Sequence, residues 1–140
     1  MCAVFKTHHS ISKPSQTIAA ISSNGCCEHV WAGFARAEIL GWWIDRKGGR
    51  LLDVPATEFA ERSDATGKLV WESIPSGLVI RGLLDNEGRK SFIRIVTRES
   101  TPAELERFQH PRMPLLEKPL FPDVEIPAGR VSAMDLFPGF

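Results

Sequence analysis

The sequence predicts one α+β domain over residues 1–140, built on a curved, mainly antiparallel β-sheet of barrel-like form with short flanking helices. Three observations favour this class. From residue 68 the chain falls into segments rich in branched and aromatic residues, separated by turn-forming residues. Only residues 101–108 carry a clear helix signature. The length of 140 residues and the hydrophobic fraction of 43% suit a single globular domain that buries about two-thirds of its unfolded surface.

The predicted strands follow from local composition. Residues 68–74, 78–84 and 90–98 read as strands, and residues 85–88 read as a hairpin loop, so the last two strands should be antiparallel neighbours. Residues 51–54 predict a shorter strand that Pro55 ends. Residues 17–21 fit either a short strand or one helical turn, and periodicity does not choose between them.

The helix signature begins at Thr101, which can accept from free backbone N–H groups. Pro102 suits the first helical position, and Glu104 completes a capping box. Leu105 and Phe108 lie three residues apart, so we expect them to share the buried face.

This helix must end before His110, because Pro111 disfavours a helical conformation at the preceding residue. Pro114 restricts Met113 in the same way. His110 and Arg112 are therefore predicted in stiff, extended backbone just beyond a helix end. A connector with a solvent-exposed histidine is the alternative.

Charge and cysteine content exclude several classes of protein. Seventeen Lys and Arg residues balance seventeen Asp and Glu residues, so any anion binding must come from a local patch. No apolar run approaches membrane-spanning length and the start lacks a signal-peptide core, which leads us to expect a cytoplasmic protein. Three cysteines make no disulfide framework. The adjacency of Cys26 and Cys27 argues against a zinc site, so neither metal nor cofactor is expected.

Cys2 is the residue of the chain with the greatest potential for covalent chemistry. Removal of Met1 would place an α-amine and a thiol on neighbouring carbons, with ordinary pKa values of about 8 and 8.5. Such a 1,2-aminothiol condenses with an aldehyde through an imine and closes to a thiazolidine. A cysteine without any role at this position is the alternative.

Phe59 and Glu61 point to the same side if their segment is extended. A carboxylate beside a buried aromatic side chain has its charged form disfavoured, so we expect the pKa of Glu61 to rise toward a value useful for proton transfer. The alternative is a solvated acidic turn.

Basic and aromatic side chains suggest a nucleic-acid surface. Lys90, Arg94 and Arg98 fall on one face of a predicted strand and could follow a phosphate backbone. Trp42 and Trp43 could provide a surface on which bases stack. The alternatives are a charged face in contact with solvent and tryptophans in the core.

Several of these segments occur together in an order that resembles the SOS response-associated peptidase (SRAP) family. The resemblance covers roughly residues 31–116 and the first two residues. It rests on the following motifs: Met1-Cys2, Ala35-Arg36-Ala37-Glu38, Val54-Pro55-Ala56 with Phe59 and Glu61, and His110 with Arg112-Met113-Pro114.

The resemblance implies that the protein, acting as a monomer, binds abasic sites in single-stranded DNA and forms a covalent thiazolidine cross-link through Cys2, with nucleoid association in that state. Glu61 would move protons, and His110 would assist opening of the sugar ring. A self-processing cysteine peptidase activity is also implied. The phosphate-binding and base-stacking residues would be Arg36, Arg112, Lys90, Arg94, Arg98, Trp42 and Trp43.

Two departures from the family pattern suggest an alternative function. Ala3-Val4 follow the cysteine where the family has Gly-Arg, and Phe34 stands where the family has an asparagine. The alternative is a catalytically degenerate SRAP-like module that binds single-stranded DNA or a protein partner without covalent chemistry.

Overall fold

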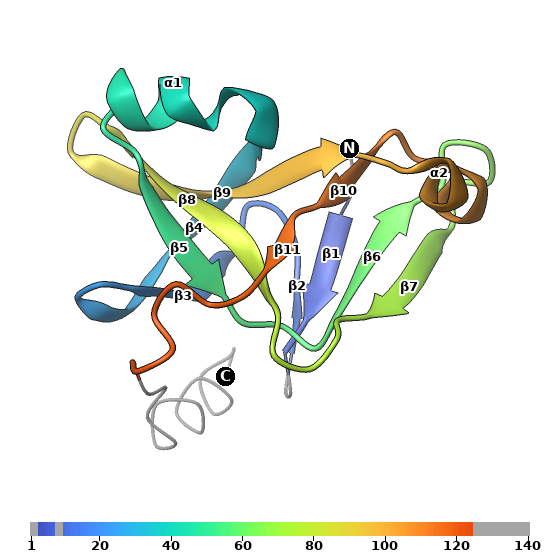
Figure 1. Ribbon diagram of the computed structural model, residues 1–140, viewed down its shortest axis with the longest axis horizontal. Coiled ribbons are helices and arrows are strands. Elements are labelled where there is room, and N and C mark those ends of the chain that lie inside the picture. The colour runs from blue at the N-terminus through green and yellow to red at the C-terminus, as the bar shows by residue number, and fades with distance from the viewer. Residues whose placement is uncertain (1–2, 8–9, 125–140) are drawn as a thin grey trace.

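The computed structural model describes residues 3–7 and 10–124. Strands predominate over helices in this part of the chain (Figure 1). In chain order the elements are β1 (Ala3–Lys6), β2 (Ile11–Ser12), β3 (Thr17–Ser22), β4 (Gly25–Arg36), the 3-10 helix η1 (Ala37–Ile39), α1 (Leu40–Asp45), β5 (Arg50–Val54), β6 (Glu58–Arg62), β7 (Leu69–Ser73), β8 (Val79–Glu87), β9 (Lys90–Glu99), α2 (Pro102–Phe108), β10 (Arg112–Pro114) and β11 (Leu116–Glu117).

The larger sheet curves into a ring. Its strand order is β10-β9-β4-β3-β5-β8-β11, and an additional pairing between β8 and β9 closes the circuit. All pairings in this sheet are antiparallel except that of β4 with β9, which is parallel. A second, antiparallel sheet of order β2-β1-β6-β7 lies beside the ring (Figure 1). The predicted α+β class and curved, mainly antiparallel sheet are confirmed.

The strand predictions are largely confirmed. Strands β5, β7, β8 and β9 match the predicted segments within a few residues, and β8 pairs with β9 in an antiparallel hairpin. The hairpin turn is tighter than predicted, because Glu87 pairs with Lys90 and leaves Gly88 (φ +64°) within a two-residue turn. Residues 17–21 form strand β3 rather than a helical turn.

Helix α2 begins as its sequence predicts. The Thr101 side chain accepts from the Glu104 backbone N–H, the Glu104 carboxylate accepts from the Thr101 N–H, and Pro102 is the first helical residue. The prediction that Leu105 and Phe108 share a buried face is wrong. Phe108 is buried and stacks on Phe59 at 5.9 Å between ring centroids, but Leu105 is 49% exposed. The helix lies at the edge of the molecule, so only its last turn reaches the core (Figure 1).

The core lies between the two sheets and inside the ring. Its main cluster contains Phe5, Trp31, Phe59, Phe108 and Met113, which come from both sheets and from α2. A buried ion pair between Arg81 and Asp53 crosses from β8 to β5. Because Asp53 also accepts the backbone N–H groups of Leu120 and Phe121, this pair anchors the segment after β11.

Within residues 3–7 and 10–124, no helix is long and apolar enough to cross a membrane. Residues 125–140 lie outside the described part of the chain.

Candidate active site at Glu61 and His110

Strand β6 holds Glu61 in the interior. Its neighbours β1 and β7 pair on both sides, with Ala3 opposite Glu61 on β1 and Val70 opposite it on β7. The Glu61 residue is only 1% exposed, so the segment is a buried strand and the alternative of a solvated acidic turn is wrong.

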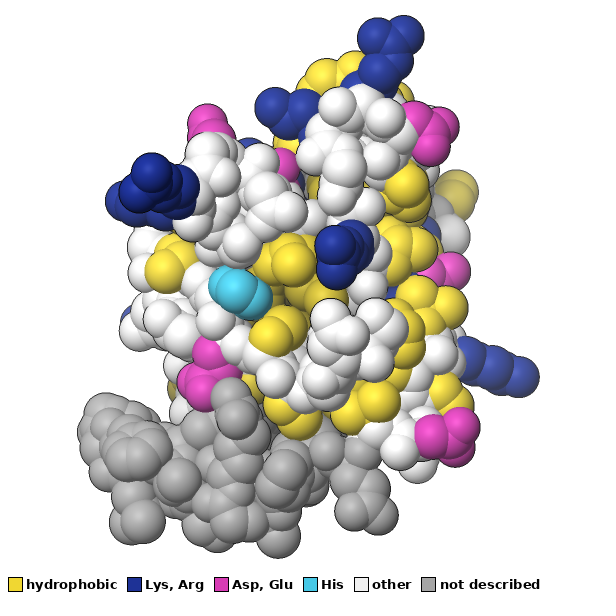
Figure 2. Space-filling model, turned by 90° about the vertical axis from the view of Figure 1, so that its left-hand side faces the viewer, with side chains coloured by type: hydrophobic (Ala, Val, Ile, Leu, Met, Phe, Trp, Pro, Cys, Tyr) yellow, Lys and Arg dark blue, Asp and Glu magenta, His cyan; other side chains and the backbone are white. Residues whose placement is uncertain are grey.

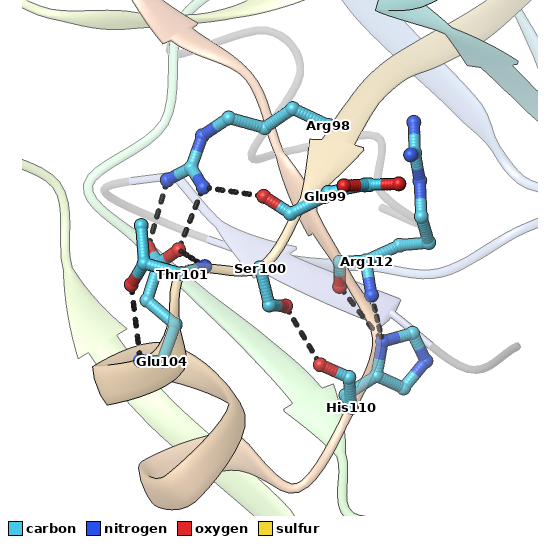
Figure 3. Close-up of polar contacts among 7 residues, drawn as sticks. All are labelled: Arg98, Glu99, Ser100, Thr101, Glu104, His110 and Arg112. Atoms are coloured by element: carbon cyan, nitrogen blue, oxygen red, sulfur yellow. Dashed lines mark hydrogen bonds and ion pairs between the residues drawn. The ribbon is translucent and has the colours of Figure 1, made fainter.

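His110 lies between α2 and β10 and is 3% exposed. The Ser100 hydroxyl donates to the His110 carbonyl at 2.7 Å, which fixes the backbone (Figure 3). The ring atom Nδ1 lies 2.7 Å from the Arg112 carbonyl oxygen and 3.2 Å from the Arg112 backbone nitrogen. The shorter contact assigns the proton to Nδ1, because only a protonated Nδ1 can donate to a carbonyl. Nε2 is then the ring atom available for chemistry.

Glu61 and His110 meet at the predicted site. Nε2 of His110 lies 3.8 Å from Oε2 of Glu61, although Glu61 is on strand β6 and His110 lies in the connection between α2 and β10. This distance exceeds that of a good hydrogen bond. The expected approach of both side chains to the Cys2 amine stays a prediction, because Cys2 lies outside the described residues.

The surroundings of Glu61 favour its neutral form. Its Oε2 is buried and has no hydrogen-bond partner among the described residues. Burial raises the pKa of Glu61 from 4.5 to about 8, in the direction that Phe59 on the same strand suggested. A cavity of about 10 Å³, the space of one water, is lined by Glu61, Phe34 and Thr97, among others. Near neutral pH the carboxyl group is therefore mostly an acid with a proton to donate.

Arg112 forms contacts within the protein rather than at its surface. Its guanidinium donates two hydrogen bonds to Glu38, at 2.6 and 2.9 Å, and a third to the Thr97 carbonyl at 2.7 Å. These bonds lower the pKa of Glu38 to about 2 and raise that of Arg112. Arg112 therefore ties the residues after β4 to strands β9 and β10, and a phosphate would have to compete with Glu38 for it.

Two cations of the predicted basic strand are also paired. Arg94 donates to Asp85 at 2.9 Å and lies over the Trp43 ring, 4.7 Å from its centroid. Arg98 donates to both oxygens of Glu104 at 2.6 and 2.7 Å (Figure 3). Lys90 is exposed at the hairpin. On the face shown in Figure 2, basic side chains stand apart from one another around a hydrophobic centre, without forming a continuous patch.

The remaining predicted DNA contacts divide between surface and interior. Arg36 is exposed at the end of β4, and Trp42 is 49% exposed on α1. Trp43 packs against the smaller core cluster of Ala35, Leu83 and Val96, so it is a core residue in part, as the alternative proposed. Its ring meets that of Trp42 edge-on at 5.0 Å. Only Trp42 of the two presents a large free surface.

Cys2 lies outside the described residues. The described chain begins with Ala3, whose backbone pairs with Glu61.

Two further groups at the site were not among the predicted site residues. Ser100 and Thr97 hold His110 and Arg112 through the bonds described above. Thr97 lies near the end of strand β9, and Ser100 immediately precedes the cap of helix α2.

Comparison with known proteins gives no match to any family model, any curated protein or any solved structure. The SRAP assignment therefore stays a prediction that rests on the motifs in the sequence.

Proposed function

We propose that the protein, after removal of Met1, captures abasic sites in single-stranded DNA as a thiazolidine on Cys2. One observation carries the proposal: a buried acid and a buried imidazole, 3.8 Å apart, lie beside the strand that continues directly from Cys2. The residues match, in position, the proton-transfer groups that the SRAP resemblance implies.

The chemistry needs one base and one acid. The α-amine of Cys2 attacks the aldehyde carbon of the ring-opened deoxyribose, and the proton that the nitrogen loses passes through Nε2 of His110 to the former aldehyde oxygen, which gives a carbinolamine. Glu61, protonated near neutral pH, donates its proton to that hydroxyl group, which leaves as water and generates an iminium ion. The Cys2 thiolate then adds to the iminium carbon, and the proton lost by the thiol restores the acid form of Glu61. The product is protein plus DNA minus one water.

Phosphate contacts have a smaller role in this proposal than the sequence suggested. Arg94, Arg98 and Arg112 each have a carboxylate partner. Arg36, Lys90 and Trp42 are exposed and are the better contacts for a single strand. Recognition of the lesion would then come mainly from the reaction with its aldehyde.

Phe34 favours a second candidate function. Its ring lines the cavity beside Glu61, where an SRAP protein has a polar asparagine. An apolar wall at this point suits a module that has lost part of its catalytic machinery and binds single-stranded DNA or a protein partner without a covalent bond.

Intact mass measured under denaturing conditions tests the first function. The protein is mixed with a single-stranded oligonucleotide that carries one abasic site, beside an undamaged oligonucleotide and the variant Cys2→Ser. We expect an adduct of protein plus DNA minus water, only with the abasic site and only with Cys2. The unmixed sample reports whether Met1 is absent.

The strand that carries Glu61 offers a matched pair of variants. Glu61→Gln removes the acid, whereas Glu58→Gln changes a half-exposed carboxylate on the same strand that pairs with Lys6. We expect at least a tenfold slower adduct formation with Glu61→Gln, as for loss of general acid catalysis, and an unchanged rate with Glu58→Gln. No adduct from protein that has lost Met1 refutes the covalent function and leaves the binding module.

A further inference from the structure

The turn that carries His110 is bonded to the turn that follows Glu61. Gln109 ends helix α2, and three of its polar groups bond in different directions. Its N–H donates to the Leu105 carbonyl at 2.9 Å, its carbonyl accepts the Asp64 N–H at 3.0 Å, and its side-chain oxygen accepts the Ser63 hydroxyl at 2.7 Å. The residue before His110 is therefore fixed to the residues just beyond β6.

Gln109 has a backbone conformation that glutamine rarely adopts. Its φ of +51° and ψ of +43° lie in the left-handed region, which costs a residue with a Cβ about 1 kcal/mol. Such a conformation persists only where surrounding contacts impose it. Here the bonds to Ser63 and Asp64 impose it, and they set the direction in which the chain enters His110.

Ser63 is held as firmly as its partner. It is 3% exposed, and its hydroxyl oxygen accepts the N–H groups of Ala65 and Thr66, each at 3.2 Å, while its proton goes to Gln109. Ser63 lies two residues after Glu61 on the same chain segment. A short path of bonds thus joins the backbone of Glu61 to that of His110.

We propose that Ser63 and Gln109 are positioning residues, whose side-chain hydrogen bond sets the separation of His110 Nε2 from Glu61 Oε2. The inference deepens the proposed function by naming the contact that assembles its acid and base. On the other side of His110, Ser100 bonds only to its backbone carbonyl. The hydrogen bond between Ser63 and Gln109 is therefore the side-chain link between the two turns that bear the reacting groups.

A positioning role differs from a purely structural one in what it changes. Gln109→Gly loses one hydrogen bond but relieves the left-handed conformation, so its effects on the free energy of unfolding nearly cancel. The site nevertheless loosens, and water gains access to Glu61. Since burial is the main cause of the raised pKa of Glu61, a loosened site lowers that pKa. His110 and Asp64 are the titratable groups nearest this carboxyl on the neighbouring turns.

The experiment follows the Glu61 carboxyl carbon by ¹³C NMR between pH 4 and 10. Wild-type protein is compared with Gln109→Gly, Gln109→Asn and Ser63→Ala. Asparagine tolerates the left-handed conformation but is too short to reach Ser63, so it serves if the glycine variant does not fold. Ser15→Gly is the matched control, because Ser15 is also left-handed (φ +75°) and lies on a different turn, before β3.

We expect the midpoint of Glu61 to fall by about one pH unit or more in the Ser63 and Gln109 variants and to stay unchanged in Ser15→Gly. Adduct formation should slow at least tenfold in the same variants. A midpoint that stays or rises in folded variants overturns the positioning role. If the midpoint falls but the wild type forms no adduct, the positioning role stands and the covalent function fails.

Discussion

Replacing Glu61 by glutamine should make the protein more stable, and increasingly so as the pH rises. Glutamine keeps the size and shape of the side chain but has no charged form. In the wild type, Oε2 is buried without a hydrogen-bond partner among the described residues. Ionisation therefore creates a buried charge that no hydrogen-bond donor compensates.

The magnitude follows from the two pKa values. The carboxyl group titrates near 4.5 in the unfolded chain and near 8 in the folded protein. Between these values the unfolded state binds fewer protons than the folded state, so the free energy of unfolding falls as the pH rises, by about 1.4 kcal/mol per pH unit. The loss begins near pH 4.5 and is complete above pH 8. From pH 5 to pH 9, the wild type should lose about 4 kcal/mol relative to Glu61→Gln.

Urea unfolding at pH 5, 7 and 9 measures this difference, since all other titrating groups are shared and cancel. Glu58→Gln is the control: Glu58 is on the same strand, 37% exposed and 3.7 Å from Lys6, so its removal should change stability by less than about 1 kcal/mol at every pH. Parallel curves for wild type and Glu61→Gln would refute the raised pKa. If the free energy of unfolding of the wild type instead rises relative to that of Glu61→Gln as the pH rises, Glu61 is ionised and paired with a charged His110.

Four further outcomes are expected. Asp53→Asn should lower the free energy of unfolding by about 1.5–3 kcal/mol in urea titrations, because it removes the buried carboxylate partner of Arg81 and leaves Glu117 as its remaining ion-pair partner. Thr101→Ala should cost about 1 kcal/mol in the same assay through loss of the helix cap, and a change below a few tenths would contradict the capping box. Phe34→Asn should lower the pKa of Glu61, followed by ¹³C NMR, because it brings an amide to the cavity wall; an unchanged midpoint would mean that the two side chains are not coupled. Fluorescence anisotropy at several salt concentrations measures the affinity for single-stranded DNA. A plot of the logarithm of the binding constant against the logarithm of the salt concentration should have a slope of about −1.4, as for two phosphate contacts. A slope near −3.5 would require all five predicted cations.

Local chemistry made α2 and the β8–β9 hairpin predictable. Thr101, Pro102 and Glu104 satisfy the first turn of the helix whatever packs against it, and Gly88 suits the turn between two β-rich segments. The exposure of Leu105 was not predictable in this way. Spacing along a helix says which side chains share a face, but the surrounding fold decides how much of that face is covered.

Contacts between distant segments account for what the sequence did not predict. The parallel pairing of β4 with β9, which is part of the ring, has no local signal in the sequence. The bond between Ser63 and Gln109 is equally invisible, because a serine in a turn and a glutamine after a helix are common. The meeting of Glu61 with His110 was expected only through the resemblance to SRAP proteins, since neither residue's neighbours point to the other.

The ion pairs of the three arginines bear on how such a site would find its target. Arg94, Arg98 and Arg112 form ion pairs with Asp85, Glu104 and Glu38, in that order. These three arginines make up most of the predicted basic surface. A protein with formally zero net charge and internally paired arginines should bind undamaged DNA weakly. Covalent capture tolerates weak binding, because an adduct accumulates with time at each encounter with an aldehyde. A reversible binding module lacks this compensation, since its occupancy depends on affinity alone. The paired arginines therefore fit the covalent function better than the non-covalent one.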